Sequence, residues 1–455
     1  MSSSSSSSKR VGGRVRNPGL ESRPSTSRSR RRRGRGGGNG VWPGPVVEAL
    51  AFQVAIDAVT TNGRLAAATA LATLFQVCST WQAVSRSPLL WLNLTARVWN
   101  RHHLLRHTWR DEYIFWHQAA ANFRMGRYVY STLHFVPPNA AENAADGLSC
   151  RRLTLSDHHL AAGFSDGSVL LFYIPSRLHL STFHPHHRDR LGRFSSAVSG
   201  IILTDARLVF ASLDGDVHVV TVGGSLPPRR AHLGDVVNDG ALVDFAGNDR
   251  WWVGLYAGVP GRAFHIWNAA REELVFVGGN LSDPEAVMGW HLLTELTDLV
   301  GRVRVTSHDS AVACTSLRII VFDLANQGVV IGEEDRFPRG LVVGAFDARN
   351  DSFLAVDDRG AASVCRAADL SQRCWFSVRG ASQGGVVGCM NGGFAVTAAS
   401  GVIRVWDIER DEVGVYLRSL RERNLDVNLL VSDERHLAGW SRDGTLHLWD
   451  FGGQQ

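Results

Sequence analysis

The sequence predicts a multidomain α+β chain in which a basic tail and a helical region precede an all-β propeller, expected to have seven blades. Three observations support this prediction. Residues 1–40 are rich in Ser, Arg and Gly, with almost no apolar side chains. Residues 41–127 carry apolar side chains at helical spacing. From residue 158 onward a strand–turn–strand pattern recurs every 41 to 55 residues, a period typical of propellers with four-stranded blades.

Length and composition narrow the class of protein. A chain of 455 residues has room for two or three folded units, and a hydrophobic content of 44% is ordinary for a globular protein. The six cysteines form no C-x-x-C pair, which favours reduced thiols in a cytosolic or nuclear protein. No apolar run approaches the roughly 18 residues of a membrane-spanning helix, and the amino-terminal residues are not those of a secretory signal. We expect no membrane association.

The basic character of the chain is concentrated in its tail. Residues 1–40 hold eleven Lys and Arg and one Glu, whereas the remaining residues carry 37 basic and 42 acidic side chains. A segment with so few apolar residues is predicted to be disordered. Its dense positive run indicates nuclear import, or loose and non-specific contact with nucleic acid, or simply a solvated tail. The import residues would be Arg28, Arg30, Arg31, Arg32, Arg33 and Arg35.

Residues 41–95 are predicted to form three short helices. Pro43 and Pro45 suit a first helical turn, and apolar residues then recur near helical spacing from Val46 to Ala58. Gly63 is predicted to end the first helix, and Pro88 to end the helix that precedes it. So small a unit buries little surface alone, so we expect another protein to complete part of its apolar surface. A helical subdomain packed only on the rest of the chain is the alternative.

The order of motifs in this region resembles an F-box. It runs Trp42-Pro43, then V-C-x-x-W at 77–81, then S-P-L-L-W at 87–91, and it departs from the family at Trp42, where Leu is usual. The resemblance implies docking on a Skp-type adaptor and, through it, on a cullin ubiquitin ligase. The residues expected on the apolar surface shared with the adaptor are Pro43, Val47, Leu50, Val77, Cys78, Trp81, Leu90 and Trp91.

Residues 96–127 are predicted to hold an amphipathic helix. Trp109, Tyr113, Trp116 and Phe123 share one helical face, and Gly126 suits a helix end. The segment resembles the linker helix of F-box proteins that carry WD repeats, with Phe123 in place of a Trp. The helix would either set the distance between adaptor and propeller or simply pack in the core, and the two roles are compatible.

Residues 128–455 contain the repeats. Asp-Gly pairs at 166, 214 and 443 favour hairpin turns, and Trp406-Asp407 and Trp449-Asp450 resemble the WD dipeptide. Because five of the repeats are degenerate, a propeller of six or of eight blades is also compatible with the sequence. The alternating strand at 128–135 is predicted to supply the outer strand that the last blade lacks, closing the ring and protecting its edge. Each repeat includes an alternating strand that ends in an aromatic or apolar residue, which we call its anchor. The seven anchors are Phe172, Val220, Trp267, Phe322, Cys365, Trp406 and Trp449.

No motif for catalysis or cofactor binding is present. The chain has no phosphate-binding loop, dinucleotide fingerprint or H-E-x-x-H, and its histidine clusters at 102–103 and 184–187 lack metal-ligand spacing. We therefore predict no catalytic residue, no metal and no cofactor. Cys78 is interpreted as packing, and Asp433 and Asp443 as members of structural networks.

The resemblance to plant F-box proteins with WD repeats spans the chain beyond its tail. It implies a non-enzymatic, nuclear substrate receptor of a cullin–Skp-adaptor–F-box ubiquitin ligase that regulates flower and organ development. Its targets would be PEAPOD-type transcriptional repressors and their KIX-domain partners. The alternative is a nuclear transcriptional regulator or scaffold that uses the tail for DNA and the propeller for protein contacts. Candidate substrate-binding residues on the turns are Asp166, Asp214, Arg359, Ser441 and Arg442.

Overall fold

The computed structural model describes most of the chain beyond the tail. The described ranges are 44–135, 149–186, 193–224, 226–279, 301–306, 309–315, 318–335, 343–357, 359–380, 385–410, 413–422 and 425–453. The predicted tail, its import arginines and Pro43 lie outside these ranges.

Four helices, not the predicted three, lie between residues 44 and 100, where the structure describes the chain. They are α1 (Gly44–Asn62), α2 (Ala66–Phe75), α3 (Ser79–Val84) and α4 (Pro88–Trp99). The extra helix arises at S-P-L-L-W, because Pro88 stands in the first turn of α4 and the Ser87 hydroxyl accepts a hydrogen bond from the backbone N–H of Leu90 at 3.3 Å. We call α1–α4 the helical module.

The predicted linker helix is α5 (Trp109–Met125). Thr108 caps its first turn, since its hydroxyl accepts from the backbone N–H of Asp111 at 3.1 Å. Gly126 ends it with φ of 60°, a left-handed conformation that favours glycine. The buried face of α5 includes Tyr113, Trp116 and Phe123.

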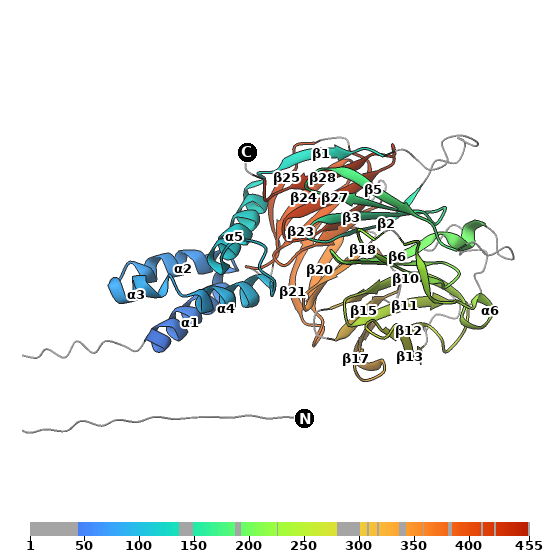
Figure 1. The fold of residues 1–455 in the computed structure, drawn as a ribbon, viewed down its shortest axis with the longest axis horizontal. Helices are drawn as coiled ribbons and strands as arrows, with labels where there is room; N and C mark the ends of the chain where they lie inside the picture. Colours follow the sequence, from blue (N-terminus) through green and yellow to red (C-terminus); the bar gives the residue numbers. More distant parts are fainter. Residues whose placement is uncertain are drawn as a thin grey trace, which may run out of the picture. The chain divides into compact units, whose positions relative to one another are not determined.

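Seven four-stranded antiparallel sheets follow, which confirms a seven-blade propeller (Figure 1). In each of the first six blades the strands pair in chain order. Blade one holds β2 (Cys150–Leu155), β3 (His159–Phe164), β4 (Val169–Tyr173) and β5 (Leu178–Phe183); blade two β6 (Val198–Leu203), β7 (Arg207–Ser212), β8 (Val217–Thr221) and β9 (Arg229–His232); blade three β10 (Ala241–Gly247), β11 (Trp251–Ala257), β12 (Phe264–Asn268) and β13 (Glu273–Gly278).

The next three blades repeat the pattern. Blade four holds β14 (Arg302–Val305), β15 (Ser310–Cys314), β16 (Arg318–Asp323) and β17 (Val329–Asp335); blade five β18 (Val343–Arg349), β19 (Ser352–Asp357), β20 (Ala361–Arg366) and β21 (Gln372–Ser377); blade six β22 (Val387–Met390), β23 (Phe394–Ala399), β24 (Val402–Asp407) and β25 (Val415–Ser419). A short 3₁₀ helix (Arg193–Ser196) and α6 (Val236–Asp239) lie between strands. All seven predicted anchors lie on third strands and are buried.

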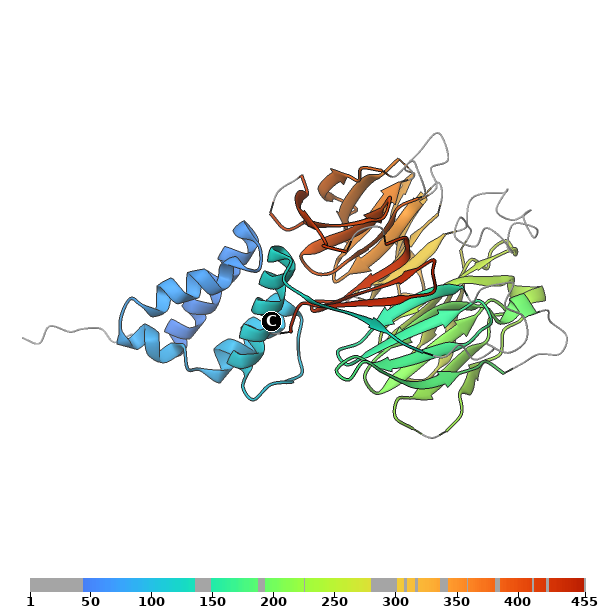
Figure 2. The same ribbon diagram turned by 90° about the horizontal axis from the view of Figure 1, so that it is seen from above.

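The last blade joins the two ends of the propeller sequence. It contains β26 (Val427–Ser432), β27 (His436–Ser441) and β28 (Leu446–Asp450), and its outer strand is β1 (Val129–Leu133), from the stretch predicted at 128–135. Tyr130 pairs with Trp449 in this register. Figures 1 and 2 show β1, in teal, beside the red carboxy-terminal strands.

Strand direction gives the propeller two distinct ends. Neighbouring strands are antiparallel, so turns between first and second strands and between third and fourth strands share one end. We call this end the helical face, because its turns contact the helices. Turns between second and third strands share the opposite end, the far face. Among the described residues, no helix is both long and apolar enough to cross a membrane.

Candidate functional site

The helical module leaves apolar side chains uncovered. Val46, Leu50 and Val54 recur every four residues along α1, on one stripe, and each is about two-fifths exposed. Val77 precedes α3 and Leu89 opens α4; both are more than half exposed. Because α1 contacts both α3 and α4, these side chains belong to adjoining elements. An apolar surface of this kind is typical of a protein-binding site. We call these five residues the apolar stripe.

The predicted adaptor-binding residues divide into two groups. Leu50, Val77 and Cys78 are exposed. Val47, Leu90 and Trp91 are buried in the core of the helical module, where Trp91 packs on Tyr113 with ring centroids 5.2 Å apart. Trp81 is partly buried against the same core. The buried members therefore shape the module, and only the exposed ones are available for contact.

Cys78 does not pack in the core, so its interpretation as a packing residue is wrong. It stands at the N-terminal cap of α3 with an extended backbone, a position that leaves its side chain exposed. Backbone N–H groups of Trp81 and Thr80 lower the pKa of its thiol. The other five cysteines are buried.

A buried arginine ties the helical module to the propeller. Arg64, between α1 and α2, forms ion pairs with Glu434 and, at 3.4 Å, with Glu409. Its Nη2 donates to Oδ1 of Asn391 at 3.2 Å, and its guanidinium lies 5.1 Å from the ring centroid of Trp99. Asn391, Glu409 and Glu434 stand on turns of the helical face, so the contacts fix that end of the propeller to the helices.

Helix α5 completes the attachment. Phe123 stacks on Phe451 with centroids 3.6 Å apart, and Asn122 donates to the carbonyl of Phe451 at 2.7 Å. Buried Glu112 of α5 ties the helix to the connection before it, because its carboxylate accepts from the backbone N–H of Arg106 at 2.9 Å and from the Trp116 indole of α5 at 2.7 Å. The contacts of Phe123 and Asn122 pack α5 against the carboxy-terminal end of the last blade.

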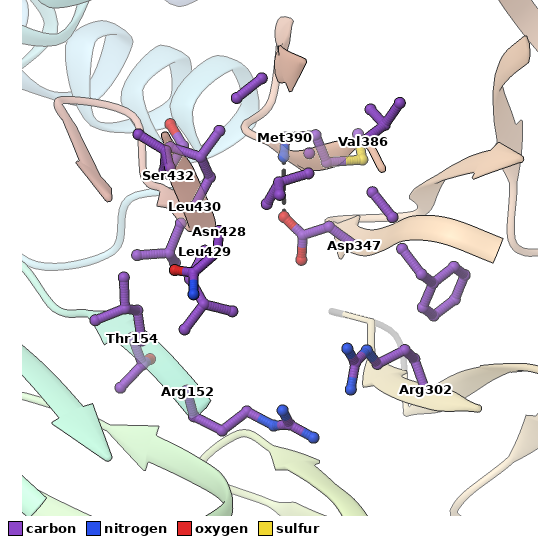
Figure 3. A pocket seen from close by; sticks show the side chains of 18 of the residues that line it. Arg152, Thr154, Arg302, Asp347, Val386, Met390, Asn428, Leu429, Leu430 and Ser432 are labelled. Carbon is purple, nitrogen blue, oxygen red and sulfur yellow. Dashed lines mark hydrogen bonds between the residues drawn. The ribbon is translucent and has the colours of Figure 1, made fainter. Parts of the chain in front are cut away.

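A cavity of about 700 Å³ runs along the innermost strands of all seven blades. Among the described residues, six arginines and four aspartates line it. Figure 3 shows Arg152 and Arg302 reaching toward each other from opposite walls. The positive residues at its far-face end are Arg151, Arg302 and Arg442, which we call the arginine mouth.

Asp244 organises the middle of the cavity. Its carboxylate, which is buried, lies 3.1 Å from Nη2 of Arg152 and 2.9 Å from Nη1 of Arg304, and it accepts from the backbone N–H of Val303 at 2.8 Å. Burial alone would raise the pKa of Asp244, but Arg304, Arg152 and Arg302 outweigh it and hold that pKa below its usual value. The aspartate therefore stays charged and fixes the two guanidinium groups.

Backbone irregularities aim side chains into this cavity. Five of the innermost strands, β2, β6, β10, β18 and β26, change register near their far-face ends, as a bulge does. In β2 the irregularity lies at Arg151, and both Arg151 and Arg152 line the cavity although they are neighbours in sequence. A bulge re-aims a side chain that strict alternation would send to the other side.

Four of the predicted substrate-binding residues lie on turns of the far face and Ser441 ends strand β27 beside such a turn, but three of the five are held by local hydrogen bonds. Asp166 accepts from the backbone N–H of Ser168 at 2.9 Å, and buried Asp214 accepts from the Ser212 hydroxyl at 2.6 Å. Ser441 is buried and contacts His447 Nε2 at 2.8 Å. These three therefore support turns.

The remaining two predicted residues are accessible. Arg359 is exposed, and its backbone N–H donates to Asp357 at 2.9 Å. Arg442 is exposed, lines the cavity and lies 3.4 Å from Asp426. Of the five predicted residues, only Arg442 therefore joins the arginine mouth.

Hydrogen bonds of histidine and aspartate side chains in the propeller connect strands or support turns. His447 Nδ1 lies 2.8 Å from the hydroxyl of Tyr130, so the histidine links β28 to the closing strand β1. Asp433 accepts from the backbone N–H of Arg435 at 2.6 Å, within a turn. Within the part of the chain that the structure describes, no three His, Cys, Asp or Glu side chains gather as metal ligands would.

The cavity arginines are not among the predicted residues, because substrate-binding residues of the propeller were expected only on turns. Their signal was present as paired and alternating arginines in otherwise apolar inner strands, at 151–152 and at 302 and 304. The innermost strands line the central cavity, so charged side chains on such strands are the pattern that could have found them.

Comparison with known proteins identifies a relative along the whole chain. The transcriptional regulator STERILE APETALA of Arabidopsis thaliana is 54% identical over 454 residues, which cover 99% of each chain. No family model matches the chain.

Solved structures with similar folds are WD40 propellers. The RRP9 WD40 repeats align with a TM-score of 0.51 at 12% identity, over 70% of this chain and 97% of that one. The Pan2 WD40 domain of Neurospora crassa aligns with a TM-score of 0.52 at 12% identity, over 72% and 96%. At such low identity these similarities establish the WD-type propeller fold alone.

Proposed function

This chain belongs to the STERILE APETALA family, and we propose that it is the substrate receptor of a cullin–Skp-adaptor–F-box ubiquitin ligase. In this proposal the helical module is the F-box, and a Skp-type adaptor covers the apolar stripe. The observation that carries the proposal is the stripe itself, standing on a helical module whose V-C-x-x-W and S-P-L-L-W motifs resemble an F-box.

The far face is proposed to bind the target. Arg64 and α5 fix the helical module at the opposite face, so a target at the arginine mouth would not compete with the adaptor. Three arginines at one opening favour an acidic or phosphorylated segment, because charge complementarity steers association and guanidinium groups pair well with carboxylates and phosphates. The chain itself would perform no chemistry, and catalysis would come from holding a target lysine near a ubiquitin-charged carrier.

PEAPOD-type repressors and their KIX-domain partners are the proposed targets, and the protein would act in the nucleus during flower and organ development. Support for these targets comes from the family resemblance. The name of the Arabidopsis relative supports a role in transcriptional regulation and therefore a nuclear location.

The two sites can be tested separately in one binding experiment. The charged substitutions Leu50→Asp and Val77→Asp are expected to weaken adaptor binding by tenfold or more, since losing apolar interface contacts costs on the order of 2 kcal/mol. Arg151→Glu with Arg442→Glu is expected to preserve adaptor binding and to weaken binding of a PEAPOD-type repressor by a similar factor. Co-purification and titration with each purified partner would measure both effects.

Matched substitutions control for each surface. Leu178→Asp changes an exposed leucine on the outer strand β5, and Arg250→Glu reverses an exposed charge on the helical face. Both controls should bind adaptor and repressor normally. Undiminished adaptor binding by the folded Leu50→Asp, Val77→Asp variant would exclude the apolar stripe as the docking site.

A second candidate function is favoured by the relative's name and the basic tail. A DNA-associated transcriptional regulator would place the tail arginines on phosphates, with the propeller as a scaffold for proteins. It differs from the receptor in one respect that can be measured. DNA binding would fall steeply with salt and disappear when residues 1–40 are deleted, whereas adaptor binding would survive that deletion.

A further inference from the structure

The positive charges of this chain are almost all arginine. Of 48 Lys and Arg residues, one is lysine, Lys9 in the tail, and no lysine occurs from residue 10 to residue 455. Base composition does not explain this. Asparagine and lysine share the first two bases of their codons and differ only in the third, yet the chain has 17 asparagines. The scarcity is therefore specific to lysine as an amino acid and does not follow from the bases of its codons.

Folding does not explain it either. Arginine is required where its guanidinium group donates two parallel hydrogen bonds, as Arg435 does to the Asp450 carboxylate at 2.8 and 2.6 Å. However, Arg229, Arg250 and Arg366 have side chains 60%, 68% and 53% exposed, and their contacts with carboxylates are ones that an ammonium group would also make. Exposed ion pairs of this kind contribute little to stability, so exchange for lysine at such sites is nearly neutral.

Lysine and arginine differ sharply in ubiquitin transfer. A neutral amine attacks the thioester carbonyl of a ubiquitin-charged carrier; the amide C–N bond forms, the C–S bond breaks, and the carrier thiol leaves with the proton that the amine loses. Lysine, with a pKa near 10.4, supplies some neutral amine. Arginine stays protonated in proteins and supplies none. A receptor holds its own surface near the carrier, where proximity accelerates transfer to any amine.

We propose that the lysine-free folded part protects this receptor from ubiquitylation while it presents its targets, and that Lys9 is the one side-chain amine through which the protein itself can be marked. This inference rests on the proposed receptor function. It assigns a modification site to the tail and a chemical reason to the arginine content of the propeller and helices.

Reconstitution of the full ligase tests the proposal. The complete chain, Skp-type adaptor and cullin would be incubated with ubiquitin, activating enzyme, carrier and ATP. Four forms would be compared: the unaltered chain, Lys9→Arg, the triple variant Arg229→Lys, Arg250→Lys, Arg366→Lys, and a control with glutamine at the same three positions. Peptide mass spectrometry would locate conjugates, and discharge of the carrier onto added free lysine would measure ligase activity.

We expect the unaltered chain to carry ubiquitin only at Lys9 and the Lys9→Arg variant to lose it. The triple lysine variant should gain conjugates at the new lysines, at least about tenfold above the unaltered chain, because of proximity. The glutamine control should gain none. In plant cells the triple lysine variant should have a several-fold shorter half-life.

Three failures are distinguishable. If the complex assembles and discharges the carrier onto free lysine but the triple lysine variant gains no conjugates, the protective role is overturned and the receptor function stands. Conjugates that persist on Lys9→Arg would overturn the assignment of Lys9. If the chain binds no adaptor, the receptor function itself fails, and the inference fails with it.

Discussion

Replacing Arg64 with alanine is expected to destabilise the protein by about 3–5 kcal/mol, the largest effect of any single substitution considered. The side chain of Arg64 is only 4% exposed, and that of its partner Glu434 6%. Burial alone would raise the pKa of Glu434, but Arg64 and then Arg349 outweigh it and hold that pKa below its usual value. Without Arg64 a buried carboxylate loses its closest positive partner.

The loss would appear first at the junction between helices and propeller. Arg64 contacts three turns of the helical face through Asn391, Glu409 and Glu434, so its removal loosens the helical module before the distant blades. Chemical denaturation would measure the loss of stability, and limited proteolysis would show cleavage between α1 and α2 before the propeller is cut.

Two further variants separate charge burial from general disruption. Arg124→Ala on α5 removes a partly exposed arginine 3.9 Å from Asp407 and should cost less than about 1 kcal/mol. Arg64→Met combined with Glu434→Leu replaces the pair by apolar groups and should recover most of the loss. Equal destabilisation by Arg64→Ala and Arg124→Ala would contradict the role given to Arg64.

Ending the chain after Gly444 is expected to abolish the folded monomer. This truncation removes β28, which lies between β1 and β27 in the last blade. Leu446, Leu448 and Trp449 are buried there, and burial of each such side chain contributes about 1.5–3 kcal/mol. Their sum is comparable with the whole stability of a typical domain, about 5–15 kcal/mol.

Loss of closure adds a second effect. With β28 absent, β1 and β27 expose unpaired edges that favour aggregation. Size-exclusion chromatography and thermal unfolding should show aggregates and no cooperative transition. A chain ending after Gly453 keeps Phe451, which stacks on Phe123, and should behave as the full chain does. A cooperative, monomeric protein ending at Gly444 would contradict closure through β28.

The periodic parts of this fold could be predicted from sequence because each repeats a local pattern. The seven anchors lie at fixed places in their blades, and the alternation at 128–135 marked β1 although its partner β28 lies three hundred residues away. The predicted number of helices is one too few, because Pro88 in the first turn of α4 and the Ser87 cap start a new helix, whereas from sequence Pro88 indicates only the end of the preceding one.

Exposure was harder to predict than secondary structure. Val46 and Val47 are neighbours with similar side chains, yet one is exposed and the other is buried, because α1 turns only one of them toward the core. The arginine mouth depends on strands from separate blades meeting around one cavity, and no local pattern shows which blades face one another. Site residues set by tertiary placement therefore required the structure.

In the proposed receptor, an adaptor covers the apolar stripe while the far face stays open. Hydrogen exchange of the full chain, measured by mass spectrometry with and without a saturating plant Skp-type adaptor, tests it most directly. We expect slower exchange in α1, at Val77 and in α3, with no change in the far-face turns that carry Arg359 and Arg442. Protection confined to the propeller, or no protection from a well-folded chain, would contradict it.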